Sequence, residues 1–364
     1  MGCRPAGHFV CLRRMFPYWA LFSVFGAGAL LSSGEQRQRI SLLLALALVA
    51  AALMIGFRYR VGGDWHHYDL MYDYISMLDF GDMLTVPNSD PGYSFLNWFG
   101  QLFDLRIWFV NLVCALIFVW GLARLAVQQP QPWLFFLTAT SYGLVVVGMG
   151  YTRQSVAIGL CAAALAAFND RGLGRAALYF IAAAVFHKTA ILMLPLIAMA
   201  DRHRPVITAL WGLILAALLF YFLLAPTSSM LYENYVNAQQ ESQGAGVRVA
   251  MTIVPAVAFL LLQRRLGFGP RELTLYRTLA LAGVATGVCL ALIPSSTVVD
   301  RMNLYLIPFQ SVVLCRLPLT QTDRRGELLV RAGVAAYSAT VLFVWLNYAV
   351  NAQLWLPYRL YPLA

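Results

Sequence analysis

The chain has 364 residues, of which 60% are hydrophobic and only 12% are charged. A soluble globular domain is closer to half apolar and a quarter charged, so this composition excludes a cytosolic enzyme, a disordered chain and a nucleic-acid binder. The formal net charge of +10 does not change that conclusion, because membrane proteins concentrate Arg in their cytoplasmic loops. A polytopic membrane protein is the class that remains.

Apolar segments long enough to cross a bilayer, about 20 residues each, recur along the whole chain. The expected spans are 15–33, 40–57, 106–127, 133–150, 153–168, 205–226, 247–263, 273–294, 298–316 and 329–348. The stretch 175–200 is also apolar, but His187 and Lys188 divide it into two shorter halves. The sequence therefore predicts an all-α polytopic membrane protein with about 11–12 transmembrane or re-entrant helices, organised as a single membrane domain over 1–364.

Charge decides how the stretch 175–200 crosses the membrane. Five connections are rich in Arg, namely 35–39, 169–175, 201–204, 263–272 and 316–325. All five lie in the cytoplasm, as the positive-inside rule favours, only if 175–200 enters and returns as a hairpin with His187 and Lys188 at its outer tip. The same topology places the N-terminus outside, which conflicts with the positive charges of Arg4, Arg13 and Arg14.

Two long outer loops follow from this topology. The main periplasmic loop, 58–105, carries seven of the 16 acidic residues, and the second covers 227–246. Within the main loop one helical face would hold Tyr68, Met71, Tyr72, Ile75 and Leu78, and the other Asp69, Asp73 and Ser76. The segment 66–83 is therefore predicted to be an amphipathic helix that lies on the outer leaflet.

Polar residues at the outer ends of the expected spans are the candidates for chemistry, because ionisable groups near hydrocarbon are costly. They form four clusters: Arg58, Arg60 and Asp64; Arg153 and Gln154; His187 and Lys188; and Asp300, Arg301 and Tyr305. Arg binds phosphate oxygens bidentately, and an Arg at a helix N-terminus adds to the favourable field for anions there. Together the clusters suit a phosphate-bearing lipid substrate that reacts at the outer leaflet.

Each cluster also has a simple structural explanation. An Arg and an Asp pair at many helix ends, an Arg at a span end reaches lipid headgroups, and a lone His is often a buried hydrogen-bonding group. No metal or cofactor is expected, because the six Cys show no CxxC spacing and His66, His67 and Asp69 have no second ligand group at a convincing spacing. P-loop, HExxH and GxSxG motifs are absent from the sequence.

Several short elements occur in a defined order between residues 57 and 358. They are 57–65 (FRYRVGGDW) with Tyr68, 90–93 (DPGY) with Leu96 and Asn97, Arg153 and Gln154 with Ala157, 184–190 (AVFHKTA), Asp300 and Arg301 with Tyr305, and 356–358 (LPY). This ordered set resembles the EpsG-type, Wzy-like family of polysaccharide polymerases. Asp90 stands where Glu is expected in that family, and Gly63 stands where Thr is common.

The resemblance implies a GT-C-like helical fold in a bacterial inner membrane, with the active site facing the periplasm. Such an enzyme joins oligosaccharide repeat units carried on undecaprenyl pyrophosphate, as in exopolysaccharide or O-antigen synthesis. The growing glycan leaves its carrier and is transferred to a hydroxyl of the next lipid-linked unit. The implied partners are these lipid-linked oligosaccharides and membrane lipids, with a chain-length regulator left open and no nucleic acid expected.

On this interpretation the catalytic candidates are Arg153, which would stabilise the departing pyrophosphate, and Asp64 or His187, one of which would be the general base. The substrate-binding candidates are Arg58, Arg60, Tyr68, Tyr93, Gln154, Lys188, Arg301 and Tyr305. Three alternatives stay open. A ligase would differ in its acceptor, a flippase or transporter would have internal repeats and ionisable residues near the midplane, and a membrane acyltransferase would need more than His187.

Overall fold

The computed structural model describes residues 8–32, 41–86, 89–200, 242–293 and 295–363, with five single positions at 206, 210, 213, 214 and 217. Nearly all of the expected span 205–226, most of the loop 227–246 and the connections 35–39 and 201–204 lie outside the described residues. The described part is helical, with one isolated antiparallel bridge between Arg58 and Leu360. The predicted all-α class is therefore confirmed.

The α-helices are α1 (His8–Leu31), α2 (Leu42–Gly56), α3 (Trp65–Ile75), α4 (Phe80–Met83), α5 (Pro91–Leu102), α6 (Ile107–Ala126), α7 (Pro132–Ala139), α8 (Gly148–Gly150), α9 (Thr152–Arg171), α10 (Leu173–Phe186), α11 (Met193–Ala198), α14 (Ala245–Leu262), α15 (Pro270–Leu292), α16 (Ser296–Asn303), α17 (Ile307–Arg316) and α18 (Arg324–Tyr348). A π-helix, η2 (Thr140–Val147), joins α7 to α8. Four 3₁₀ segments are η3 (Lys188–Leu192), η6 (Leu304–Leu306), η7 (Leu317–Thr320) and η8 (Ala352–Leu354).

Six helical stretches in the described part are long and apolar enough to cross a membrane. They are 107–126, 132–150, 245–262, 270–292, 296–320 and 324–348, and each coincides with an expected span. Shorter apolar helices cover 42–56, 173–186 and 188–198. Many Leu and Val side chains on both the long and the short apolar helices, such as Leu43, Val254 and Leu329, are exposed, as contact with lipid chains requires. The chain is thus a multi-pass membrane protein.

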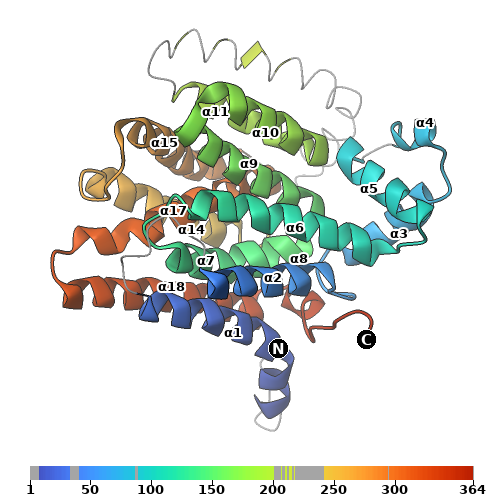
Figure 1. The fold of residues 1–364 in the computed structure, drawn as a ribbon, viewed down its shortest axis with the longest axis horizontal. Coiled ribbons are helices and arrows are strands. Elements are labelled where there is room, and N and C mark those ends of the chain that lie inside the picture. Colours follow the sequence, from blue (N-terminus) through green and yellow to red (C-terminus); the bar gives the residue numbers. More distant parts are fainter. Residues whose placement is uncertain are drawn as a thin grey trace.

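The helices form three layers (Figure 1). In this view α1, α2 and α18 lie below, α10, α11 and α15 lie above, and α6, α7, α9, α14 and α17 fill the middle, while α3, α4 and α5 project at one end. α6 and α9 approach each other very closely, since a Cβ on Gly121 would lie only 1.9 Å from the carbonyl oxygen of Gly159. Small residues allow such close backbone approach between membrane helices.

The Arg-rich connections meet at one end of the bundle. Arg316 donates from Nε to Oε1 of Gln129 (2.8 Å) and from Nη2 to Oε1 of Glu272 (3.1 Å), which joins the ends of α6, α15 and α17. The guanidinium of Arg271 lies 5.6 Å from the ring of Phe168 and brings the end of α9 to the same place. The connections 169–175, 263–272 and 316–325 therefore share one side, as the topology argument requires.

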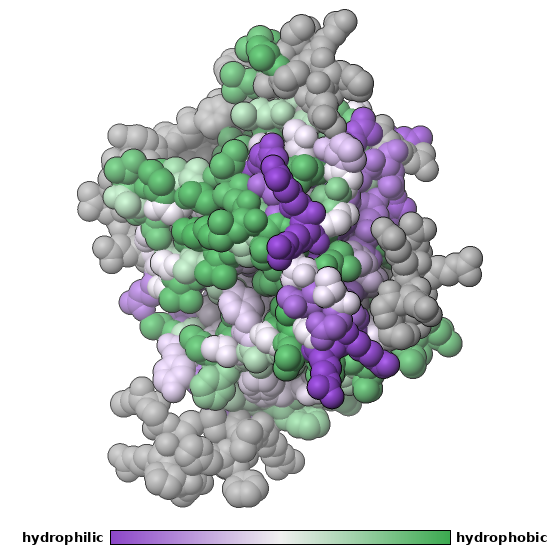
Figure 2. All heavy atoms as spheres, turned by 90° about the vertical axis from the view of Figure 1, so that its left-hand side faces the viewer, coloured by the Kyte–Doolittle hydropathy of each residue, from purple (hydrophilic) through white to green (hydrophobic). Residues whose placement is uncertain are grey.

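Six exposed arginines project from this end, and they come from the 263–277 and 324–325 segments. They are Arg264, Arg265, Arg271, Arg277, Arg324 and Arg325. Figure 2 looks at this end of the molecule and shows strongly hydrophilic residues beside a broad apolar surface. The positive-inside rule makes this the side expected in the cytoplasm.

The chain reverses direction at His187. α10 packs along α9 and ends at Phe186, and the following η3 and α11 turn back to contact α10, with α11 also contacting α15. Figure 1 shows α11 beside α10. The hairpin expected over 175–200 is therefore confirmed, with His187 at its tip and at the end of the bundle away from the Arg-rich connections.

The amphipathic helix is shorter than predicted. α3 buries Trp65, Tyr68, Met71, Tyr72 and Ile75 on one face, which confirms its amphipathic character. It ends at Ile75, however, and α4 is a separate single turn that begins at Phe80, so the continuous helix predicted over 66–83 is wrong. The hydroxyl of Ser76 donates back to the carbonyl of Asp73 (2.7 Å), a local bond that competes with helix continuation.

Residues 354–361 support the loop that follows α2. The amide of Gly62 donates to the carbonyl of Leu354 (2.9 Å), and the amide of Tyr59 donates to the backbone carbonyl of Arg359 (2.9 Å). The indole of Trp355 is buried and donates to the carbonyl of Val145 (2.9 Å). Gly62 has φ +109°, and a Cβ there would lie 2.1 Å from the carbonyl oxygen of Met149. Only glycine fits this position, and it fixes where Asp64 emerges.

Replacing Gly62 with Ala should destabilise the protein by about 1–3 kcal/mol through backbone strain alone, before the clash with Met149 is counted. Gly63→Ala is the matched control, because its Cβ would meet only ordinary contacts at 3.8–3.9 Å with Leu354 and Trp355. Thermal unfolding of the purified protein in detergent measures both. Equal melting temperatures for the two variants would contradict the placement of this loop.

Candidate functional site

Asp90 holds together two of the four predicted clusters. Its carboxylate accepts from Nη1 of Arg153 at 2.9 Å and from the backbone amide of Lys188 at 3.2 Å. Asp90 is the N-cap residue of α5, but its side chain makes no capping bond, although Asp at this position usually does. The carboxylate is used instead to join the start of α9 to the tip of the 175–200 hairpin.

The Asp90–Arg153 pair is well shielded from solvent, with side chains 5% and 19% exposed. Burial raises the pKa of the Asp90 carboxyl, and the nearby Arg153 guanidinium and the amide of Lys188 lower it in part. Arg153 also lies over the ring of Tyr68, 5.8 Å from its centroid. Tyr93 is completely buried behind Tyr68, with 5.3 Å between the ring centroids.

Asp64 is the second N-cap aspartate whose side chain makes no capping bond, here at the start of α3. It is half-buried, and the charges of Arg301 and Arg153 both act on it. Burial raises the pKa of the Asp64 carboxyl, and the two guanidinium groups oppose that shift. A carboxyl with a raised pKa next to cations is suited to accept and release a proton.

His187 is fixed through one ring nitrogen. Its Nδ1 lies 2.7 Å from the hydroxyl of Thr189 and 2.9 Å from that of Tyr305, and these two hydroxyls lie 3.0 Å apart. The described hydrogen bonds to the ring are thus all at Nδ1, so Nε2 is the nitrogen on the opposite edge. The charges of Arg153, Arg301 and Lys188 act on the ring and disfavour a positive charge on it.

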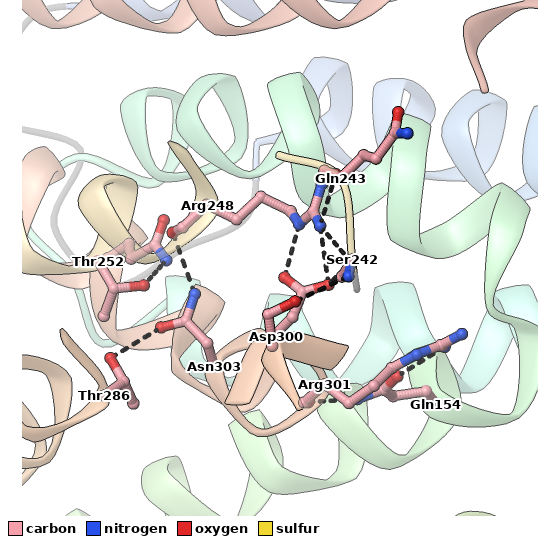
Figure 3. A network of polar contacts seen from close by, with 11 residues as sticks. Gln154, Ser242, Gln243, Arg248, Thr252, Thr286, Asp300, Arg301 and Asn303 are labelled. Carbon is pink, nitrogen blue, oxygen red and sulfur yellow. Dashed lines mark hydrogen bonds and ion pairs between the residues drawn. The ribbon is translucent and has the colours of Figure 1, made fainter. Parts of the chain in front are cut away.

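Arg301 joins the cluster from α16. Its guanidinium lies over the ring of Tyr151, 4.2 Å from the centroid, and Nη1 lies 3.4 Å from Oε1 of Gln154. The amide of Gln154 donates to the carbonyl of Arg301 at 2.8 Å. Figure 3 shows the two side chains alongside one another, with Asp300 directed to the other side of α16. The start of α9 and the last turn of α16 therefore bring Arg153 and Arg301 to one place.

Arg58 is an internal support of the site. It is 1% exposed, and its guanidinium donates to the carbonyls of Ile55 (2.7 Å) and Val61 (3.2 Å). It also donates to Oδ1 of Asn111 (3.1 Å) and Oγ1 of Thr152 (2.6 Å). All four of these partners are protein groups, so the guanidinium of Arg58 holds the loop 58–64 against α9. The sequence suggested a contact with substrate for this residue instead.

Arg60 contacts its chain neighbour Tyr59. It is exposed, and its guanidinium lies 5.3 Å from the ring centroid of Tyr59. The structure thus brings together Asp64, Tyr68, Arg153, Gln154, His187, Lys188, Arg301 and Tyr305. Arg58 and Tyr93 are buried behind them, and Arg60 is exposed against Tyr59. Within the described part of the chain, no three His, Cys, Asp or Glu side chains form a group that could hold a metal ion.

Sequence reasoning missed four residues that complete this arrangement. Asp90 and Thr189 stand inside the motifs quoted above. An Asp directly before Pro91 does give a sequence signal, but helix-capping rules would assign its side chain to capping α5, which it does not do. Tyr151 directly precedes α9 and gave no separate signal. Arg248 pairs with Asp300 at 2.6 Å, and nothing in the sequence connects residues so far apart.

Comparisons with known proteins give one result on function. A family model described as the EpsG family matches residues 12–360. No curated protein and no solved structure matches the chain.

Removing the carboxylate in Asp90→Ala should cost about 3–5 kcal/mol of stability, the range for breaking a buried pair by deleting one partner. Asp73→Ala, an exposed acid on α3, is the control and should change stability by less than about 0.5 kcal/mol. Both are measured by thermal unfolding in detergent. A tolerated Asp90→Ala would show that the pair does not hold α9 to the hairpin tip.

Proposed function

The chain belongs to the EpsG family, and from that premise we propose that it polymerises lipid-linked oligosaccharide repeat units. Family membership supports a polysaccharide polymerase-type role in a multi-pass membrane protein. The finer proposal is a glycosyltransferase that moves the growing glycan from undecaprenyl pyrophosphate to a hydroxyl of the next lipid-linked unit. The observation that carries it is the convergence of Arg153 and Arg301 beside Asp64 and His187.

The two arginines suit the leaving group. During transfer the bond from the anomeric carbon to the pyrophosphate oxygen breaks, and the carrier departs as a polyanion. Cations held in advance at the place where charge develops stabilise the transition state more than the ground state. Arg153 stands at the start of α9, where the helix N-terminus adds to the favourable field for anions. Arg301 lies in the last turn of α16 and contributes its own positive charge, and Lys188 adds a third.

Asp64 is our first assignment for the general base. As the new bond forms between the acceptor oxygen and the anomeric carbon, the acceptor hydroxyl gives its proton to a carboxylate or imidazole. Asp64 makes no capping bond within α3, so its carboxylate can serve this role, and a raised pKa matches it to the task. His187 is the second assignment, because Tyr305 and Thr189 fix its Nδ1 edge and direct Nε2 to the other side.

The remaining site residues would contact sugars. Tyr68 presents a ring beside Arg153, and Gln154 lies next to Arg301. Tyr305 presents a ring next to His187 and uses its hydroxyl to hold the Nδ1 edge of His187. Aromatic faces and amide groups are suited to the apolar faces and hydroxyl groups of a glycan.

Charge asymmetry supports a periplasmic location for the site. The exposed arginines of the 263–277 and 324–325 segments mark the expected cytoplasmic side, and the cluster lies at the opposite end with the acidic 58–105 region. A transporter of the same lipid would concentrate ionisable groups near the midplane. The described charged residues gather at the two ends instead, which favours the polymerase over the flippase.

Cells that lack the native gene, complemented with wild type or Arg153→Ala, test the function when lipid-linked glycans are resolved by size. We expect wild type to make long chains and Arg153→Ala to leave single repeat units on the lipid at the outer leaflet, with at least a hundredfold loss of transfer. Arg60→Ala is the control with near-normal chains. Units trapped on the cytoplasmic face would mean a flippase, and long chains left on their carrier would mean a ligase.

The pH dependence of transfer distinguishes the two bases. Asp64 acts in its deprotonated form, so the rate should fall as the pH drops through its pKa, at a higher pH than for a solvent-exposed Asp because burial raises that pKa. Asp64→Asn should lower the transfer rate about 10²–10⁴-fold. His187→Gln should still show the fall in rate at low pH that Asp64 causes. The reverse pattern would make His187 the base.

A further inference from the structure

A buried ion pair lies directly beside Arg301, outside the residues that face the site. Arg248 of α14 donates from Nε to Oδ1 of Asp300 at 2.6 Å and from Nη2 to Oδ2 at 2.9 Å. Arg248 and Asp300 are 9% and 6% exposed. Pairs like this seldom add much stability, because desolvation offsets the attraction, so their presence at the site end calls for another role.

The pair is the centre of a network that holds one face of α16. The hydroxyl of Ser242 donates to Oδ2 of Asp300 (2.9 Å) and accepts from Nη2 of Arg248 (2.6 Å). One turn further along α16, the amide of Asn303 donates to the backbone carbonyl of Arg248 (3.0 Å). Figure 3 shows Asp300 and Asn303 both directed at Arg248. The side chain and the backbone of a single residue therefore bind two successive turns of α16.

The opposite face of the same helix carries Arg301. α16 spans only Ser296–Asn303, and a helix of about two turns is marginal by itself. Its rotation is set by contacts that include Arg248 on one side and Tyr151 with Gln154 on the other. Releasing Asp300 would let α16 turn and carry the Arg301 guanidinium away from the site.

Charge gives a second reason for the pairing. Asp300 is next to Arg301 in the chain, and both of its carboxylate oxygens are engaged by Arg248 and Ser242. Without Arg248, the buried carboxylate would attract Arg301 in competition with an anionic substrate. Arg248 thus both orients α16 and keeps Asp300 from competing.

We infer that Arg248 is a positioning residue, which acts through Asp300 to hold Arg301 toward the pyrophosphate of the substrate. The inference rests on the proposed function for the identity of the anion, and on geometry alone for the orientation of α16. Arg248 would touch neither the sugar nor the carrier.

Binding of inorganic pyrophosphate to the purified full-length protein tests the inference, together with amide hydrogen exchange across α16. Arg248→Met should weaken pyrophosphate binding at least tenfold and speed exchange in 296–303 at least tenfold. Arg316→Met is the matched control, because Arg316 is equally buried and pairs with Glu272 (3.1 Å) at the Arg-rich end. It should leave both measurements within twofold of wild type even where it lowers thermal stability.

The double variant Arg248→Met with Asp300→Asn separates positioning from simple support. Removal of the competing carboxylate should restore part of the pyrophosphate affinity, although exchange in α16 stays fast. Equal behaviour of Arg248→Met and Arg316→Met in both measurements would overturn the inference. If wild type does not bind pyrophosphate, the proposed leaving group is wrong, and hydrogen exchange alone then decides whether Arg248 orients α16.

Discussion

The high cost of placing charge in hydrocarbon is the constraint on which this structure depends. It divides the charged residues of the described chain between two ends of the bundle. At one end, arginines face outward, and Arg316 is satisfied by Glu272 and Gln129. At the other end, carboxylates and guanidinium groups pair across helices that are distant in sequence. The second arrangement concentrates cations around Asp64 and His187, and this concentration underlies the proposal that the site binds an anion.

The site is built from helix ends that forgo their ordinary capping bonds. Asp64 and Asp90 both occupy N-cap positions, and neither side chain caps its own helix. Each helix gives up a bond that typically contributes about 1 kcal/mol, and the carboxylate becomes available to Arg153, to Lys188 or to a substrate. Such local departures from good helix chemistry are expected where function takes precedence over stability.

Much of the fold could be predicted from the sequence, because hydropathy and Arg placement report the bilayer directly. The six long spans and the reversal at His187 both follow from those two signals. The break after Ile75 could not, since it depends on a local bond from Ser76 to Asp73. The roles of the two arginines near Asp64 were equally hidden. Arg58 and Arg60 stand two residues apart in one motif, but only the tertiary partners Asn111 and Thr152 show that Arg58 points inward.

The support of the Asp64 loop by residues 354–361 links the shape of the candidate site to the order of synthesis. These residues follow all six long apolar helices that the structure describes, so they leave the ribosome after those helices have begun to insert. Until they dock, Gly62 lacks its bond to Leu354, and Trp355 does not fill the space beside Gly150. A nascent or prematurely terminated chain would therefore hold its arginines in the membrane without a positioned carboxylate. The Asp64 loop therefore reaches its final conformation only after residues 354–361 have been synthesised and have docked.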